Sequence, residues 1–335
     1  MNITIAKAEE CDKLVNFLNS VFGRGQATMP QFNKMYPDIF IPTAEKMAPH
    51  ALIKDEATDE ILSCVGAYPI EMTVAGCKVP IIGIGQVSTA AQALGKGYMS
   101  ALLKYQLNTY KEKGYALAWL GGRHDRYGHF GFETSCLSFN FGFDKASTRF
   151  YQTKSKVECV KYEQISDILN DKFIELRNAE AYVIEDTLEG ILERAQRCSP
   201  DLWVVYDSET GDPKAWALIT GKWNQILEVS GDISAICDII VEASKAYTSI
   251  RLVLPHTHKP LCEFARANCA WMNSCCESLM VLNKEKLLEC YKPIIRPGTR
   301  LPSKELSNQE FIRACFGPEP NSLFLPFFLP NHYHV

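Results

Sequence analysis

Hydrophobic and polar positions follow two different periods along the first part of the chain. Between Leu14 and Phe22 apolar side chains recur at the three- and four-residue spacing of a helix face, and Gly23 ends this stretch. Three β-rich runs follow at residues 50–55, 61–73 and 78–89, separated by turn-forming residues. The pattern predicts a helix followed by an antiparallel meander.

A strand–helix–strand unit is predicted next. The last meander strand leads into Leu94-Gly95-Lys96-Gly97, and the apolar residues after this loop lie on one face of a helix that Gly114 ends. Residues 115–120 have the composition of a buried strand, and residues 135–143 form the strand expected to close the domain. We therefore predict that residues 1–148 form an α/β (α+β) domain with a mixed, mostly antiparallel sheet.

The second part of the chain repeats this order in a looser form. In residues 149–285, two helical stretches precede a predicted hairpin, which is followed by a strand, a helix and a further strand. The counterpart of the glycine-bearing turn holds only Gly231-Asp232. We expect a degenerate copy of the first domain here. Residues 286–335 are rich in proline, and the apolar run at 323–329 predicts a C-terminal tail that docks on the domains.

Composition and charge exclude several classes of protein. The chain has 335 residues, 47% hydrophobic and 22% charged, which is typical of a soluble globular protein with more than one domain. A net charge of −4 gives no basic face for nucleic acid, and no run of about 18 apolar residues indicates a membrane span. Thirteen cysteines without a signal-peptide pattern favour reduced thiols in the cytoplasm. Oligomerisation is left open.

Two pairs of histidines were considered as metal ligands. His256-x-His258 has Cys262 nearby, and His332-x-His334 lies at the C-terminus. Neither pair is completed by a Cys-x-x-Cys into the four-ligand set of a zinc site. We expect histidines in loops or in the packing, and no metal.

The loop before the central helix has the chemistry of a phosphate site. The first amide N–H groups of a helix have no intrahelical partner, and the helix dipole is positive there. Gly95 and Gly97 allow the backbone to approach a phosphate closely, and Lys96 adds positive charge. The Gly-Lys-Ser/Thr ending of a Walker A loop is missing, and Ser100 stands where a dinucleotide fingerprint has glycine or alanine.

The segment from Val87 to Leu103 resembles motif A of the GNAT superfamily of N-acetyltransferases. In that family a strand, an Arg/Gln-x-x-Gly-x-Gly/Ala loop and a helix bind the pantetheine and pyrophosphate of acetyl-CoA. Without gaps, Gly97 takes the central glycine, while Leu94 and Met99 depart from the pattern. The register Gln92-x-x-Gly95-x-Gly97 also fits, but it shifts the helix by two residues. The resemblance implies that acetyl-CoA is held by Val87, Ser88, Thr89, Leu94, Gly95, Lys96, Gly97, Tyr98, Met99 and Ser100.

A second motif lies downstream at residues 126–132. Its sequence, Arg-Tyr-Gly-His-Phe-Gly-Phe, resembles the Tyr-x-x-x-Gly-Phe element of the same family and is most similar to the Eis-like acetyltransferases. Those proteins have two tandem acetyltransferase-like domains, the second of them degenerate. Tyr127 matches the family's general acid, which protonates the departing CoA thiolate. A phenol with a pKa near 10 can protonate a thiolate with a pKa near 8.5.

The resemblance implies direct transfer of an acetyl group to the primary amine of a small molecule or peptide. A backbone N–H in the stretch Val87–Thr89 would polarise the thioester carbonyl. The amine must lose a proton, and the Eis-like enzymes place their C-terminal carboxylate, here that of Val335, in the active site. The other candidates for the base are water, Glu71, His124 and His129. The departures at Leu94 and Met99 leave a non-catalytic acyl-CoA sensor as the alternative.

Overall fold

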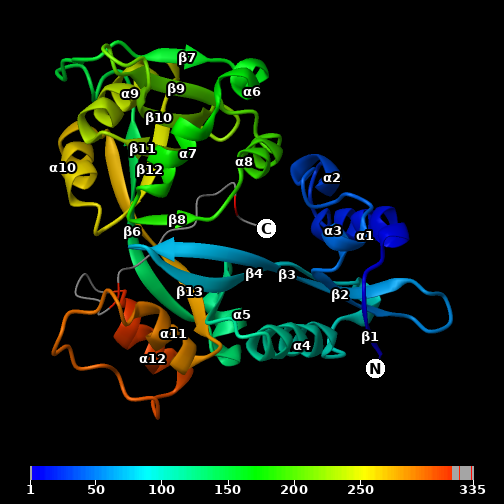
Figure 1. Ribbon diagram of the computed structural model, residues 1–335. Helices are drawn as coiled ribbons and strands as arrows, with labels where there is room; N and C mark the ends of the chain where they lie inside the picture. The colour runs from blue at the N-terminus through cyan, green and yellow to red at the C-terminus, as the bar shows by residue number, and fades with distance from the viewer. Residues whose placement is uncertain (1, 319–323, 325–332, 334–335) are drawn as a thin grey trace.

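The computed structural model describes residues 2–318, 324 and 333, and within them the strands form one continuous thirteen-stranded sheet (Figure 1). The first part of the chain forms β1 (Ile3–Ile5), α1 (Cys11–Phe22), α2 (Phe32–Met35), α3 (Ala44–Met47), β2 (His50–Lys54), β3 (Ile61–Val74), β4 (Cys77–Thr89), α4 (Tyr98–Glu112), β5 (Leu117–Leu120), α5 (His124–Tyr127) and β6 (Glu133–Phe143). The predicted meander is β2, β3 and β4, and the predicted mixed, mostly antiparallel sheet is confirmed.

The second part of the chain continues the same sheet. It forms β7 (Glu158–Val160), α6 (Ile165–Ile168), α7 (Asp171–Asn178), β8 (Tyr182–Ile184), α8 (Leu188–Ala195), β9 (Asp201–Tyr206), β10 (Pro213–Thr220), β11 (Gln225–Gly231), α9 (Ile233–Ala246), β12 (Ile250–Pro255), α10 (Lys259–Asn268) and β13 (Trp271–Val281). The helical stretch expected around Ile165 to Asn178 consists of two helices, α6 and α7, because Asn170 accepts a hydrogen bond from the Lys172 amide (3.0 Å) and starts a new helix.

The same strand order occurs in both parts of the chain. In the first part, β1 to β4 pair antiparallel in sequence, and β5 then lies parallel to β4. In the second part, β9, β10 and β11 pair antiparallel, and β12 lies parallel to β11. The sheet order from edge to edge is β1-β2-β3-β4-β5-β13-β6-β12-β11-β10-β9-β7, and β8 pairs with β3 off this path.

Strands β6 and β13 join the two parts. Strand β13 lies between β5 and β6, and β6 in turn pairs with β12. Strand β6 therefore does not close the first part of the sheet by itself, as the sequence led us to expect. Its neighbour towards β5 is β13, which lies about 140 residues later in the chain. Local residue patterns do not encode a long-range pairing of this kind.

Helices cover both faces of the first part of the sheet. Leu102, Leu103 and Leu107 of α4 pack against β4 and β5, whereas Leu14 and Leu18 of α1 pack in a separate core with β2 and β3. Figure 1 shows α4 and the group α1–α3 on opposite sides of these strands. This layering leaves the ends of β4 and β5 between α1–α3 and α5. No helix in the described part of the chain combines the length and apolarity needed to cross a bilayer.

Part of the proline-rich segment belongs to the hydrophobic core. It contains most of α11 (Lys284–Tyr291) and all of α12 (Asn308–Phe316), which the sequence analysis did not predict. Phe311 and Phe316 are fully buried, and the ring of Phe324 stacks on Tyr291 with a centroid distance of 4.3 Å. The apolar run predicted to dock lies, apart from Phe324, outside the described residues.

Candidate active site

The site begins where β4 and β5 separate. The two strands pair only over Ile81–Gly83 and Leu117–Trp119. Further along β4, two residues, Gln86 and Val87, oppose the single residue Val65 of β3, and Gln86 has a positive φ of 46°. This is a β-bulge, which locally bends and twists the strand and redirects its backbone groups.

A cleft of about 610 Å³ lies at this separation. Its floor includes Gln86 and Val87 of β4, and Tyr127 lies on the side that follows β5. The opposite wall comes from the region between α1 and α2, with Phe22 and Tyr36 among its side chains. The structure thus brings Val87 and Tyr127, which the sequence analysis took from separate motifs, to one cleft.

Tyr127 is the last residue of α5 and is 7% exposed. Burial raises the pKa of its phenol, and the nearby charge of Arg126 opposes this shift. The hydroxyl is therefore protonated at neutral pH, as a proton donor must be. The ring is held edge-on to Phe132 at 6.2 Å, and a Cβ at Gly122 would lie 2.6 Å from it. Glycine at position 122 is what allows the ring to occupy this place.

The loop before α4 contains the two glycines that the sequence predicts for a phosphate site. Gly95 and Gly97 have φ values of 76° and 77°, in the left-handed region that favours glycine. Gly97 is the N-cap of α4 and provides no side-chain cap, so the amides of the first turn, at residues 98–100, point away from the helix without an intrahelical partner. A Cβ at either glycine would meet nothing within 4 Å. The loop therefore faces open space, which fits the approach of a diphosphate.

The corresponding helix of the second part of the chain begins differently. Helix α9 follows β11 as α4 follows β4, but its N-cap Asp232 accepts a hydrogen bond from the Ala235 amide (3.0 Å). Glu180 accepts another from the Gly231 amide (3.1 Å). Two carboxylates thus satisfy amides at this helix start and make it unfavourable for an anion. Of the two comparable helix starts, only that of α4 suits a phosphate group.

A hydrogen-bonded chain of side chains supports the bulge from behind. His50 is fully buried, and its Nδ1 donates to the backbone carbonyl of Met47 (3.1 Å). Its Nε2 bonds to the hydroxyl of Tyr68 (2.8 Å), which also contacts the side-chain amide of Gln86. Burial lowers the pKa of His50 to about 4, so the ring is neutral at physiological pH. The sequence analysis missed these residues, because no local motif links them.

Three of the candidate bases, Glu71, His124 and His129, do not line the cleft. Glu71 is exposed on β3, and the His129 ring packs at a tilt against Phe130 with a centroid distance of 4.0 Å. His124 lies 3.4 Å from Glu133 in a neighbouring hollow, and Val335 is outside the described residues. Among the described residues, the cleft lining contains no carboxylate or imidazole side chain.

Two arginines give the cleft a positive border. Arg123 forms a two-point ion pair with Asp125 (3.0 and 2.6 Å). Arg126 has no ion-pair partner among the described residues. The border therefore favours an anionic group.

As for metals, no three His, Cys, Asp or Glu side chains gather to form a metal site in the described ranges 2–318, 324 and 333.

The second part of the chain holds one wall of the cleft. Arg197, just after α8, donates two hydrogen bonds of 2.6 Å to the carboxylate of Asp38, and both side chains are buried. The same guanidinium lies 5.2 Å from the ring centroid of Tyr36. This contact spans 159 residues of sequence, so the sequence analysis had no signal that could find it.

Comparison with known proteins identifies the class that this fold and site define. Residues 2–135 match the family model described as an acetyltransferase (GNAT) domain. Residues 2–135 are thus an acetyltransferase domain of the GNAT family, whose members take the acyl group from acyl-CoA.

Three solved structures show that the fold extends over most of the chain. A probable N-acyltransferase from Enterococcus faecalis V583 is 16% identical, with a TM-score of 0.68 over 87% of this chain and 75% of that one. A GCN5-related N-acetyltransferase from Kribbella flavida is 14% identical (TM-score 0.64; 86% and 73% covered). Eis1 from Mycobacterium abscessus is 12% identical (TM-score 0.61; 86% and 75% covered). At these identities the likeness establishes the fold alone. No curated protein matches the chain.

Proposed function

We propose that this protein transfers an acetyl group from acetyl-CoA to a primary amine by direct attack. The observation that supports this most is the position of Tyr127, a buried protonated phenol that shares one cleft with the bulge at Val87. In this proposal residues 1–148 are the catalytic domain, residues 149–285 a degenerate GNAT-like domain, and residues 286–335 a segment docked on both. Thirteen free cysteines support a reducing, cytoplasmic location.

The proposed binding mode follows the shape of the site. Backbone groups of Val87–Thr89 hold the pantetheine and polarise the thioester carbonyl, while the free amides at residues 98–100 hold the pyrophosphate. The loop residues Leu94–Gly97 lie between these two positions, and Lys96 adds a positive charge. Leu94 is 62% exposed, so its departure from the family pattern leaves the backbone path open.

The proposed chemistry is one acyl transfer with two proton movements. The neutral amine nitrogen attacks the carbonyl carbon, the carbon–sulfur bond breaks, and Tyr127 gives its proton to the departing thiolate. The proton of the amine goes to the C-terminal carboxylate of Val335 or to water, because no other base lines the described cleft. Removing His334 and Val335 leaves Tyr333 and its bond to Arg177 in place. An unchanged kcat/KM after that truncation excludes the carboxylate and leaves water.

We infer that the acceptor carries an anionic group close to its amine. Arg126 borders the cleft without an ion-pair partner among the described residues, and guanidinium groups bind carboxylates and phosphates well. The test compares an amino acid with its carboxamide as acceptors. The charged acceptor should have a KM roughly ten-fold lower, and Arg126→Gln should abolish that difference. Equal KM values for the two acceptors in the unmodified protein would overturn the inference.

A thiol-release assay distinguishes an enzyme from the alternative, a non-catalytic acyl-CoA sensor. The protein is mixed with acetyl-CoA and each amine of a panel, and the free CoA thiol is measured. Tyr127→Phe should lower kcat about 100-fold or more with little change in acetyl-CoA affinity, because only the proton is lost. Tyr110→Phe is the matched control, since Tyr110 is equally buried but donates to the backbone carbonyl of Ala67 on β3 and does not line the cleft. Acetyl-CoA binding without thiol release from any amine would favour the sensor.

A further inference from the structure

A second, smaller cavity lies in the other part of the chain, between β11 and β12. These strands are parallel and pair only at Gln225 and Arg251, so they separate as β4 and β5 do. The cavity of about 70 Å³ is lined by both strands and by the segment that joins α7 to β8. A space of this size holds a group of a few heavy atoms, since one water needs about 10–15 Å³.

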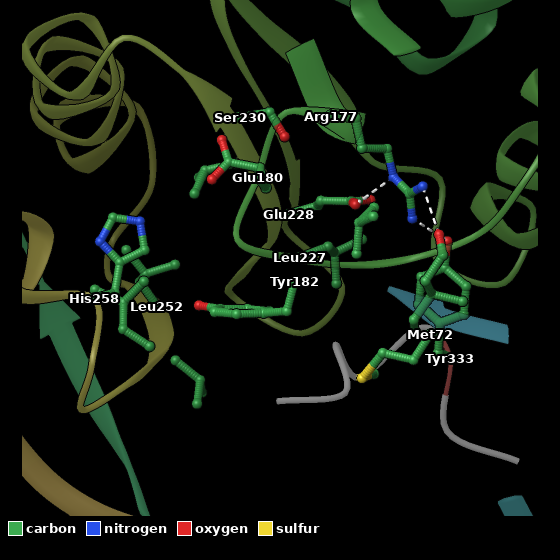
Figure 2. A pocket seen from close by; sticks show the side chains of 15 residues that line it. Met72, Arg177, Glu180, Tyr182, Leu227, Glu228, Ser230, Leu252, His258 and Tyr333 are labelled. Carbon is green, nitrogen blue, oxygen red and sulfur yellow. Dashed lines mark hydrogen bonds and ion pairs between the residues drawn. The ribbon is translucent and has the colours of Figure 1, made fainter. Parts of the chain in front are cut away.

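A buried ion pair lies at one end of the cavity. Arg177 is 1% exposed, and its Nε donates to the carboxylate of Glu228 at 2.6 Å. Its remaining nitrogens donate to the carbonyl of Ile184 (2.6 Å) and to the hydroxyl of Tyr333 (2.8 Å). Figure 2 shows Arg177 and Tyr333 together on one side of the cavity. The charge of Glu228 is therefore paired within the protein, and each nitrogen of Arg177 already donates to a protein group.

The other end has polar groups without partners. Figure 2 shows Glu180, Ser230 and His258 on the side away from Arg177, with Tyr182 below them. Ser230 is fully buried and its Oγ has no hydrogen-bond partner, and the Nδ1 of His258 also has none. Buried polar atoms are normally hydrogen-bonded, so two orphans lining one cavity indicate a missing ligand or ordered water.

The charge at this end is negative. Glu180 accepts one hydrogen bond, from the Gly231 amide, and has no cationic partner among the described residues. Burial raises the pKa of Glu180 and the neighbouring Glu228 raises it further, while burial lowers the pKa of His258 and keeps its ring neutral. A cation bound here would relieve the desolvation of the Glu180 carboxylate.

We propose that this end of the cavity is a binding site for a small primary alkylammonium ion. The ammonium would donate to Glu180, Ser230 Oγ and His258 Nδ1, and its short alkyl part would lie on apolar side chains such as Leu252. The three donors of an ammonium group match the three acceptors. A second acyl-CoA does not suit the site, because Asp232 and Glu180 place negative charge where its diphosphate would lie. This inference goes beyond the proposed function and does not depend on turnover.

The experiment measures binding of propylammonium chloride to the full chain by isothermal titration calorimetry. Propanol serves as the neutral control and potassium chloride as the inorganic cation. We expect saturable binding of propylammonium alone, weakened at least ten-fold by Glu180→Gln and also weakened by Ser230→Ala. Glu175→Gln is the matched control, because Glu175 is an exposed carboxylate on α7. An unchanged circular dichroism spectrum and thermal unfolding midpoint show that each variant is folded.

Two results would overturn the proposal. One is equal propylammonium affinity in Glu180→Gln and the unmodified protein, which would place the amine in the cleft beside Tyr127 instead. The other is the absence of saturable binding, or equal binding of potassium, which would assign the cavity to water or to a simple cation. Failure of amine acetylation with this site intact would contradict only the proposed function.

Discussion

At the scale of single residues, His50 makes the stability of the cleft floor depend on pH. Burial lowers its pKa to about 4 in the folded protein, whereas an unfolded histidine has a pKa of about 6.5. Between these values the unfolded chain binds a proton that the folded protein does not, so stability rises with pH there. The contribution of His50 is therefore fully present above about pH 6.5 and is lost as the pH falls towards 4.

This linkage predicts a difference between pH 7 and pH 5. Over that interval the unmodified protein should lose about 2 kcal/mol of unfolding free energy that His50→Gln does not lose. Urea unfolding at both pH values measures the difference, and His129→Gln, at an exposed position, should behave like the unmodified protein. The same pH dependence in His50→Gln and the unmodified protein would contradict the assignment.

At the scale of elements, the sequence predicts the helices and strands whose determining residues lie within the element or next to it. Helix α9 (Ile233–Ala246) is the helix that the sequence predicts after the hairpin and the strand that follows it, because its apolar face and its capping residue lie within it or next to it. Gly97 and Tyr127 were likewise found from short motifs. By contrast, α12 lies in a segment whose prolines dominated the pattern, and the place of β13 between β5 and β6 depends on pairings with distant strands. Such pairings are set by the packing of the whole sheet.

The loop before α4 gives the prediction at this scale. Gly97→Ala places a side chain in the left-handed region, which costs about 1–2 kcal/mol, and its Cβ enters the open space proposed for the diphosphate. We expect acetyl-CoA affinity to fall about ten-fold. Gly76→Ala is the matched control, because its φ of 81° imposes similar strain in the turn between β3 and β4 and its Cβ also meets nothing within 4 Å. Calorimetric titration should separate them; equal Kd values would contradict the role of the loop.

At the scale of the whole molecule, the two parts of the chain form one unit. Strands β6 and β13 each pair with strands of both parts, so neither part has a complete sheet without the other. The buried pair of Arg197 and Asp38 extends this union to the cleft, since Asp38 is two residues from Tyr36 in its wall. The second part of the chain, with its anionic helix start at Asp232, thus contributes to the site by holding a wall.

This arrangement predicts separate effects on the two substrates. Arg197→Gln leaves the buried Asp38 without its cation, which should cost about 3–5 kcal/mol of stability. It also releases the wall at Tyr36, so the KM for the amine should rise about ten-fold. The KM for acetyl-CoA should change little, because Tyr36 lines the cleft and the loop at residues 94–97 is not part of that lining. Steady-state kinetics with each substrate varied in turn measures both values.

A control of similar severity distinguishes positioning from general loss of stability. Asp238 is a fully buried carboxylate that accepts backbone hydrogen bonds from Lys154 and Ser155, far along the chain from the cleft wall. Asp238→Ala should lower stability by a few kcal/mol without a selective rise in the amine KM. If both variants raise that KM equally, Arg197 acts only through stability. If Arg197→Gln alone raises the amine KM, the second part of the chain shapes acceptor binding. In that case, the double variant Arg197→Gln/Asp38→Asn should raise the amine KM by less than the two single effects combined, because both changes break the same contact.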